Sequence, residues 1–208
     1  MTETDRLSWY KRTEYDRTDS ATRAQLLEAA ERVFSEVGYG RASVARIADE
    51  AGVSRATFYV YFTSRQAAFQ VLTQEFILEA EAAQRVPDAD LSDPNSIIAS
   101  TISRILELYT LKAGLLAIIE QQSRVDEDVS RMWDAFWQGQ TTRARRFVTR
   151  LQRKGRSDPG VDAGLASESM TAVLLHYGLR SNAATAQERG ALAARLVPVY
   201  QRLIGWRG

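Results

Sequence analysis

The sequence predicts an all-α protein, and two observations support this prediction. Only four prolines occur in 208 residues, and the long stretches between them are rich in Ala, Leu, Glu, Gln and Arg, which favour helix. No run of strand length alternates convincingly between apolar and polar residues. We therefore expect about nine helices, with a three-helix N-terminal bundle (21–66) joined by a fourth helix to a larger helical C-terminal domain (67–208).

The first predicted helix follows a segment of different character. Residues 1–20 mix both charge signs with few aliphatic side chains, so we expect a flexible arm. From Thr22 onward apolar residues recur at helical spacing, and Gly38 ends the run. The apolar positions of this helix are Leu26, Leu27, Ala30, Val33, Phe34 and Val37.

Two short helices are predicted next, each with its own capping residue. Ser43 can cap a helix over residues 44–50, and Ser54 can cap another over 55 to about 61. Gly52 lies in the tight turn between them, where a left-handed backbone conformation costs glycine little. The sequence therefore predicts two helices joined by a short turn.

The rest of the chain continues the helical pattern. A fourth helix begins at Thr63-Ser64, and the segment from Pro87 to Pro94 interrupts the pattern. Residues 155–160, which contain two glycines and a proline, form a second break. Beyond the first break we expect five helices, over about 95–110, 113–123, 127–154, 161–183 and 187–205.

Composition excludes several classes of protein. The chain is 45% hydrophobic and 25% charged, which is ordinary for a globular protein, and it lacks cysteine, which fits the reducing cytoplasm. No segment resembles a signal peptide or is apolar enough to span a bilayer, so no membrane is expected. His176 is the only histidine and has no partners for catalysis or metal binding. We expect no enzyme activity, no metal and no cofactor.

The two short helices form a motif that suits DNA. A helix-turn-helix needs a second helix that projects side chains into the major groove while the first braces it. Residues 43–59 meet this demand, because Ile47, Ala48 and Val53 can pack the two helices together. Since the net charge is only +1, any positive surface that faces DNA must be local.

This region resembles the TetR family of bacterial repressors. The resemblance is carried by Ser54-Arg55-Ala56-Thr57-Phe58-Tyr59-Val60-Tyr61-Phe62-Thr63-Ser64-Arg65-Gln66-Ala67-Ala68-Phe69 and covers residues 22–70. The remaining two thirds of the chain resembles the family in length and helical layout only. The resemblance implies a homodimer that binds a palindromic operator in double-stranded DNA.

The candidate DNA contacts come from the motif and its flanks. Arg55 can pair with guanine, and Thr57 can meet a thymine methyl group or a phosphate. Tyr59 resembles the family's phosphate-contacting tyrosine, and Arg65 resembles its basic residue at the start of the fourth helix. The full set of candidates is Arg41, Ser43, Arg46, Ser54, Arg55, Thr57, Tyr59, Tyr61 and Arg65.

Other features of the motif and chain have a structural interpretation beside the functional one. Phe58 and Phe62 are expected in the core, and Ser43 and Ser54 are helix caps first. The basic run from Arg143 to Arg156 is expected to be a solvated helix face, although it could bind DNA. Three basic residues of the arm could enter a minor groove, but acidic neighbours weaken this interpretation; they are Lys11, Arg12 and Arg17.

For the C-terminal domain, the resemblance implies dimerisation through the helices at 161–183 and 187–205 and a pocket for a small molecule. Their apolar faces carry Leu174, Leu175, Leu179, Leu192, Leu196, Val199 and Leu203, with Ala183, Ala184, Ala191 and Ala194 as small residues. A pocket whose walls are largely apolar and rich in aromatic residues suits a small hydrophobic or amphipathic effector. The expected pocket residues are Ile98, Thr101, Ile105, Tyr109, Ile118, Gln122, Trp133, Phe136, Trp137, Leu174 and Tyr177.

The sequence thus leads to a repressor that its effector releases from DNA, with three alternatives left open. The pocket residues could equally form an ordinary filled core. A helical carrier or enzyme could have kept the fold and lost DNA binding, although the DNA-contact set is intact. An activator or a ligandless DNA-binding protein would have the same motif. The identity of the effector, the operator sequence and the regulated genes cannot be predicted from these residues.

Overall fold

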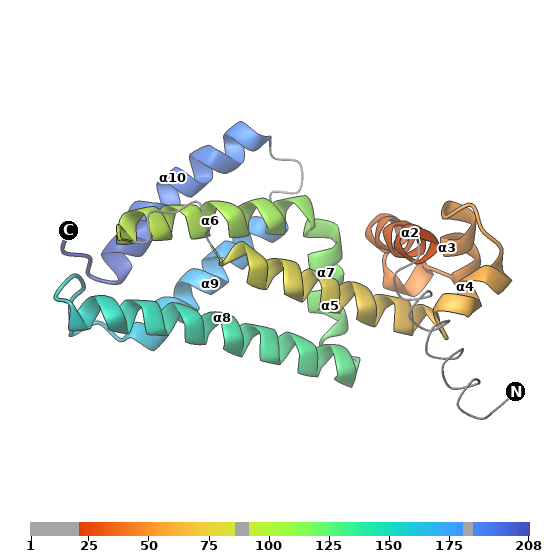
Figure 1. The fold of residues 1–208 in the computed structure, drawn as a ribbon, viewed down its shortest axis with the longest axis horizontal. Helices are drawn as coiled ribbons and strands as arrows, with labels where there is room; N and C mark the ends of the chain where they lie inside the picture. Colours follow the sequence, from red (N-terminus) through yellow and green to blue (C-terminus); the bar gives the residue numbers. More distant parts are fainter. Residues whose placement is uncertain (1–20, 86–91, 181–184) are drawn as a thin grey trace, which may run out of the picture. The chain divides into compact units, whose positions relative to one another are not determined.

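The computed structural model describes residues 21–85, 92–180 and 185–208 (Figure 1). Within these ranges the chain forms nine α-helices and one short 3-10 helix, and no strand beyond an isolated bridge between Ser157 and Trp206. The prediction of an all-α fold is confirmed. Contacts divide the chain into two units, one ending at Thr73 and the other starting at Gln74, so the division falls a few residues after the predicted boundary at 66.

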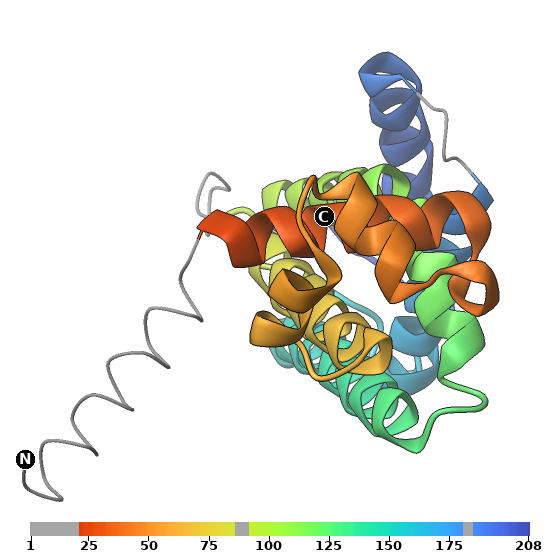
Figure 2. The ribbon, with the colours of Figure 1, turned by 90° about the vertical axis from the view of Figure 1, so that its right-hand side faces the viewer.

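Unit 1 contains the N-terminal helices. It is built from α2 (Ala21–Val37), η1 (Tyr39–Arg41), α3 (Val44–Glu50), α4 (Arg55–Tyr61) and the first half of α5 (Arg65–Ala83). Helix α3 packs against both α2 and α4 (Figure 2). The core between them is fully buried and includes Leu26, Phe34, Ile47, Phe58 and Phe69. Burial of Phe58, and of Phe62 at 4% exposure, confirms the prediction that both belong to the core.

The predicted caps and turns of unit 1 are also confirmed. The Ser43 hydroxyl accepts a hydrogen bond from the Arg46 amide (3.2 Å), which satisfies a free N–H at the start of α3. Gly38 and Gly52 have φ values of 76° and 65°, a region that favours glycine, and both lie where a helix ends. Local chemistry therefore sets the boundaries of α2, α3 and α4.

Unit 2 contains the larger helical body. Its helices are the second half of α5, then α6 (Pro94–Leu111), α7 (Ala113–Gln122), α8 (Glu127–Arg153), α9 (Ala163–Arg180) and α10 (Ala186–Leu203). Helix α6 packs against α9 and α10, and α8 packs along α9 (Figure 1). In the described part of the chain, no helix is long and apolar enough to cross a membrane.

The boundaries of α9 and α10 differ slightly from the prediction. Helix α9 begins at Ala163, two residues late, because the Asp162 carboxylate accepts hydrogen bonds from the amides of Gly164 and Leu165 and so caps the helix. Helix α10 ends at Leu203, and Gly205 follows with a φ of 60°. The predicted arm at 1–20, most of the break after Pro87, and Ala183 and Ala184 lie outside the described residues.

An aromatic cluster forms much of the core of unit 2. Phe76 of α5 contacts the rings of Tyr109, Trp133 and Phe136, with centroids 6.0 to 6.5 Å apart. Trp137 meets Trp133 edge to face at 5.6 Å. Burial of these large rings supplies much of the apolar area that holds α5, α6 and α8 together.

Candidate nucleic-acid interface and internal cavity

One face of helix α4 is buried in the core of unit 1, and the opposite face is exposed to solvent. Phe58 is fully buried, whereas Tyr59 and Val60 are 51% and 52% exposed. Arg55 and Ala56 are exposed too, and Arg55 has no side-chain partner among the described residues. Such a large exposed apolar and cationic set on a seven-residue helix is typical of a surface that binds a partner. Val60 and Ala56 are candidate contacts that the sequence reasoning missed, although their place beside Arg55 and Tyr59 could have indicated them.

The start of α4 is fixed by two hydroxyl groups. The Ser54 Oγ atom accepts a hydrogen bond from the Thr57 amide (3.0 Å) and also bonds to Thr57 Oγ1 (2.9 Å). The Ser54 cap is confirmed, and the Thr57 hydroxyl faces back toward it. Tyr61, at the end of the helix, is half-buried. This capping holds Arg55 at the first position of the helix.

The candidates before α4 are exposed. Arg46 lies on α3 with its Nη2 atom 3.9 Å from a carboxylate oxygen of Glu36, and both side chains are more than half exposed. The Arg41 Nε atom donates to the Val37 carbonyl (2.9 Å). Since these contacts are on the surface, they contribute little to stability and leave both cations open to solvent.

Arg65 has a structural role that the sequence did not predict. Its Nη1 atom donates to the carbonyl oxygens of Tyr39 (3.0 Å) and Ala42, and the guanidinium lies 4.3 Å from the centre of the Tyr39 ring. The Tyr39 ring in turn packs on Phe34 and Phe69. Arg65 therefore ties the first turn of α5 to the segment between α2 and α3, and its contact with phosphate stays a prediction.

Two further contacts brace the motif against α2. The Gln25 amide nitrogen donates to the Ala51 carbonyl in the turn (2.7 Å). Arg32 Nε lies 2.7 Å from Glu50 Oε1 at the end of α3. Each joins residues far apart in the sequence, which is why the local pattern could not predict it.

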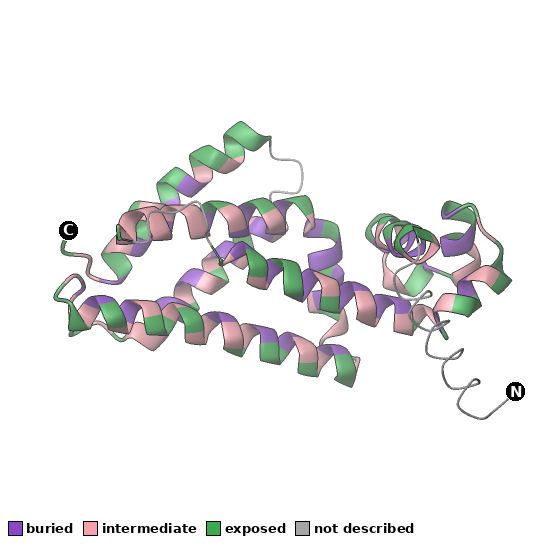
Figure 3. Cartoon of the chain, in the orientation of Figure 1, coloured by how far each residue is buried: buried purple, intermediate pink, exposed green. Residues whose placement is uncertain are grey.

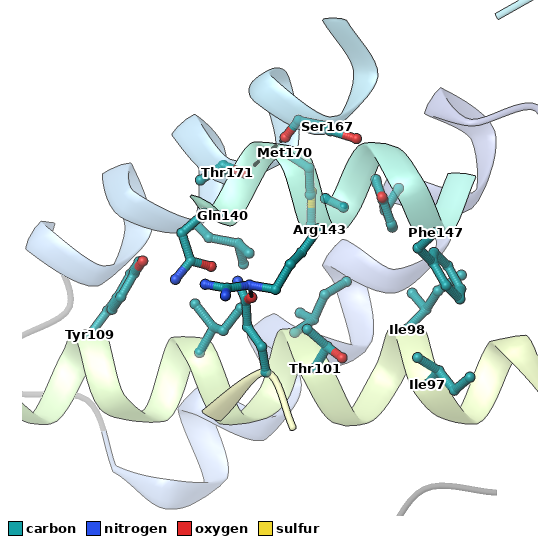
Figure 4. Close-up of a pocket in the computed structure, with 16 residues that line it drawn as sticks. Ile97, Ile98, Thr101, Tyr109, Gln140, Arg143, Phe147, Ser167, Met170 and Thr171 are labelled. Atoms are coloured by element: carbon teal, nitrogen blue, oxygen red, sulfur yellow. Dashed lines mark hydrogen bonds between the residues drawn. The ribbon is translucent and has the colours of Figure 1, made fainter. Parts of the chain in front are cut away.

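A cavity of about 210 Å³ lies inside unit 2 (Figure 4). Its walls come from the residue after α5 and from α6, α8, α9 and α10. The lining is mainly apolar and consists of Gln84, Ile97, Ile98, Thr101, Ile102, Ile105, Tyr109, Gln140, Arg143, Ala144, Phe147, Ser167, Met170, Thr171, Leu174 and Tyr200. The volume exceeds the roughly 150 Å³ of an engineered apolar cavity that binds benzene, so a small molecule can fit.

The predicted pocket residues divide into two groups. Those that line the cavity are Ile98, Thr101, Ile105, Tyr109 and Leu174. The others are not among its lining residues: Ile118, Gln122, Trp133, Phe136, Trp137 and Tyr177. Trp133 and Phe136 are buried in the aromatic cluster, which is core packing. These two aromatic residues of α8 therefore belong to the core and not to the cavity wall. Gln140 and Arg143 line the cavity, although the sequence did not predict them as pocket residues.

Eight of the sixteen described lining residues carry polar side-chain groups, although most of the wall surface is apolar. Gln140 is 3% exposed, and its Nε2 atom has no hydrogen-bond partner among the described residues. Burial raises the pKa of Tyr200 to about 12, against a smaller opposing effect of its hydrogen bond with Ser167. Burial also raises the pKa of Tyr109, so both phenols are neutral at pH 7. Arg143 is the only charged residue in the described lining.

The basic run on α8 follows the amphipathic pattern that was expected. Its cations are exposed on one face, while Val148 and Leu151 are buried on the other. Arg156 instead is half-buried, with its guanidinium 5.0 Å from the centre of the Trp206 ring. His176 is exposed and meets Tyr177 edge to face. Over the described ranges, no cluster of side chains is arranged to hold a metal ion.

Comparison with known proteins agrees with this geometry. A family model described as bacterial regulatory proteins of the tetR family matches residues 26–72, from α2 into α5. The HTH-type transcriptional regulator UidR of Escherichia coli (strain K12) is 25% identical over 158 residues, which is 76% of this chain and 79% of that protein. The HTH-type transcriptional regulator TtgR of Pseudomonas putida is 45% identical over 100 residues, 48% of each chain.

A solved structure extends the likeness of fold to nearly the whole chain. The ketosteroid transcriptional regulator KstR2 of Mycobacterium tuberculosis superimposes with a TM-score of 0.74 at 18% identity, over 91% of this chain and 97% of that one. Together with the exposed face of α4 on its capped helix-turn-helix, these matches identify the chain as a TetR-family transcriptional regulator with an N-terminal DNA-binding domain.

Proposed function

We propose that the chain is a repressor that binds a palindromic operator as a homodimer and that a small, largely apolar effector releases it. The observation that carries the proposal is the open face of α4, where Tyr59 is half exposed and Arg55 has no side-chain partner within the described ranges, on a helix that Ser54 caps. Arg55 is suited to a guanine edge, and Ala56 and Val60 are suited to thymine methyl groups. Tyr59, Ser43, Arg41 and Arg46 would contact phosphates. Such a regulator acts in the cytoplasm, where bacterial DNA lies.

The dimer would use α9 and α10, because these helices leave apolar residues exposed. Leu165 of α9 is 64% exposed, and Val199 and Leu203 of α10 are 48% and 37% exposed. Ala191 and Ala194 are exposed on α10 and would allow close approach of a second copy. The outer turns of α10 are mostly exposed in Figure 3. Two-fold pairing would place two copies of α4 on two half-sites of the operator.

Two leucines that were expected at the dimer surface have a different position. Leu174 is 6% exposed and lines the cavity, and Leu196 is 5% exposed. Both are therefore used within one chain. The proposed surface moves to the outer face of α10 and the start of α9.

The effector would occupy the cavity of unit 2. Its largely apolar walls, with polar groups among them, fit a small amphipathic molecule. Helix α5 carries Arg65 at its first residue in unit 1, and Gln84, directly after its end, lines the cavity in unit 2. A change at the cavity could thus reach the DNA-binding unit along one continuous helix, and coupling of this kind is typically about 1–3 kcal/mol.

The direct test is DNA binding by the purified full chain. Sequences selected from a random library should contain a palindrome, and the affinity should fall linearly with salt on a logarithmic scale. Arg55→Ala removes the side chain from both subunits of the proposed homodimer and should weaken binding by at least roughly 30-fold, the equivalent of two lost base contacts of about 1–3 kcal/mol each. Arg146→Ala removes an exposed arginine from α8 in unit 2 and should leave the affinity nearly unchanged.

The same experiment separates the alternatives. Absence of selective, salt-sensitive binding would refute a regulator and favour a helical carrier or enzyme. Equal losses in the two variants would exclude Arg55 from the interface. A reporter gene with and without the operator distinguishes repression from activation.

A further inference from the structure

The cavity in unit 2 carries an inference about its ligand, which rests on the proposed effector site. The lining residues of α6 lie at positions 97, 98, 101, 102, 105 and 109 and so recur every three or four residues on one face. From Ile97 to Tyr109 the helix rises about 18 Å. Lining residues also run along α8 from Gln140 to Phe147 and along α9 from Ser167 to Leu174, so the cavity is elongated along these helices. The cavity therefore fits a linear apolar chain better than a broad ring system.

The polar groups of α8 define the head of that molecule. The side chains of Gln140 and Arg143 lie one helical turn apart and point from α8 toward α6 (Figure 4). Gln140 Nε2 is a buried donor without a partner among the described residues. Arg143 can only donate, and no other described lining residue is charged. Two adjacent donors, one of them cationic, are complementary to a group that only accepts hydrogen bonds.

Arg143 already has partners that a ligand would have to replace. Its Nε atom donates to Gln84 Oε1 (2.6 Å), and its Nη2 atom lies 3.3 Å from Glu81 Oε1 on α5. The side chains of Arg143 and Glu81 are 42% and 33% exposed, so their ion pair is weak. A carboxylate in the drier cavity would bind the same guanidinium through stronger charge-assisted hydrogen bonds.

We propose that the cavity binds a linear apolar carboxylate whose head bonds to Gln140 Nε2 and the Arg143 guanidinium. On binding, the acid replaces Glu81 and Gln84 as the partner of Arg143. The polar link between α8 and the end of α5 is then lost. Arg143 is thus the residue that recognises the head group, and its release from α5 is the change that ligand binding produces in unit 2.

The test uses three probes that share a tail and differ in the head. Octanoate is an anion, octan-1-ol is neutral and octylamine is a cation. Isothermal titration of the full chain without DNA should give the tightest binding for octanoate. We expect a preference over octan-1-ol of roughly tenfold, which corresponds to about 1.4 kcal/mol. Octylamine should bind weakest, because its charge repels Arg143 and its donors duplicate those of Gln140.

Four variants make the result specific to the residues. Arg143→Gln should abolish the preference for octanoate while retaining octan-1-ol binding, and Gln140→Leu should weaken octanoate binding. Glu81→Gln should strengthen octanoate binding, because it removes a competitor for Arg143, whereas a purely structural role would not produce a gain. Arg146→Gln is the matched control on α8 and should resemble the unmodified chain.

The titrations test this ligand site without depending on whether the chain binds DNA. Equal affinity for octanoate and octan-1-ol, or a preference that persists in Arg143→Gln, would overturn recognition of the carboxylate. Absence of binding by all three probes would overturn a site for a linear chain. Since no DNA is present, failure here leaves DNA binding intact, and failure of DNA selection leaves this result intact.

Discussion

Gly178 permits a close approach between α9 and α6 in unit 2, and a single methyl group there should be costly. Gly178 lies in α9, where an added Cβ would lie 2.5 Å from the Cβ atom of Tyr109 on α6. That is roughly 1 Å closer than the 3.4 Å at which ordinary contact begins. Both atoms are attached directly to backbone, so no rotation of a side chain relieves the clash. The two helices must separate, and overpacking of this kind costs about 1–3 kcal/mol.

The magnitude follows from a matched pair of variants. Gly139 lies in α8, where an added Cβ meets only the flexible Arg143 side chain, at an ordinary 3.6 Å, so Gly139→Ala should stabilise the chain by up to about 1 kcal/mol through helix propensity. Gly178→Ala gains the same propensity but also incurs the packing cost. The difference between the two free energies of unfolding should therefore equal the packing cost of about 1–3 kcal/mol.

Urea unfolding followed by tryptophan fluorescence measures this difference. Three of the four tryptophans, Trp133, Trp137 and Trp206, lie in unit 2 and report its unfolding. Equal midpoints for Gly178→Ala and Gly139→Ala would refute the reasoning, because they would show that α6 and α9 separate without cost. Since Tyr109 lines the cavity, Gly178→Ala should also weaken binding of the octyl probes.

Three further predictions concern other parts of the fold. Arg65→Lys keeps the positive charge but loses the planar guanidinium that bonds to two carbonyls and covers the Tyr39 ring. The free energy of unfolding, measured by thermal unfolding, should fall by about 2 kcal/mol. The salt dependence of DNA binding should be unchanged, because the charge is kept. Hydrogen bonds from the backbone and side chain of Thr185 lower the pKa of Glu188 from 4.5. The stabilisation that this carboxylate gives α10 is therefore present above pH 4.5 and is lost as the pH falls through the lowered pKa. Glu188→Gln should remove this part of the acid unfolding transition, as followed by circular dichroism. Burial raises the pKa of Tyr200 from 10.0 to about 12, so the stability that the neutral phenol gives the fold is complete below pH 10 and is lost as the pH rises toward 12. Tyr200→Phe should therefore unfold less readily than the unmodified chain between pH 10 and pH 12. An unchanged midpoint of alkaline unfolding would contradict the burial of this phenol as the cause.

Local chemistry explains which parts of the fold were predictable from the sequence. The caps at Ser43 and Ser54 and the turn at Gly52 depend on residues within a few positions of one another, so short patterns locate α3 and α4. The predicted start of α9 at residue 161 is two residues early, because the Asp162 carboxylate caps the helix by accepting from the amides of Gly164 and Leu165.

The candidate sites were less predictable because they depend on residues distant in sequence. Arg65 and Arg143 have the same chemistry, yet one is tied to backbone carbonyls 23 and 26 residues away and the other to α5 across 59 and 62 residues. Aromatic content predicted a pocket near Trp133 and Phe136. These rings instead stack on each other and fill the interior. The cavity instead lies beside isoleucines and a single buried amide, whose sequence context is ordinary.

The exposure of the link between Arg143 and Glu81 limits what that link alone can transmit. An ion pair exposed to this degree contributes at most about 1 kcal/mol, which corresponds to roughly a fivefold change in an equilibrium. Stronger release from DNA would require the ligand's tail to favour one arrangement of α6 and α9 as well. Because the proposed homodimer contains two such pairs, Glu81→Gln should change operator affinity in the absence of ligand by less than about 30-fold, as measured by fluorescence anisotropy. A larger effect would mean that the end of α5 controls DNA binding through contacts other than this pair.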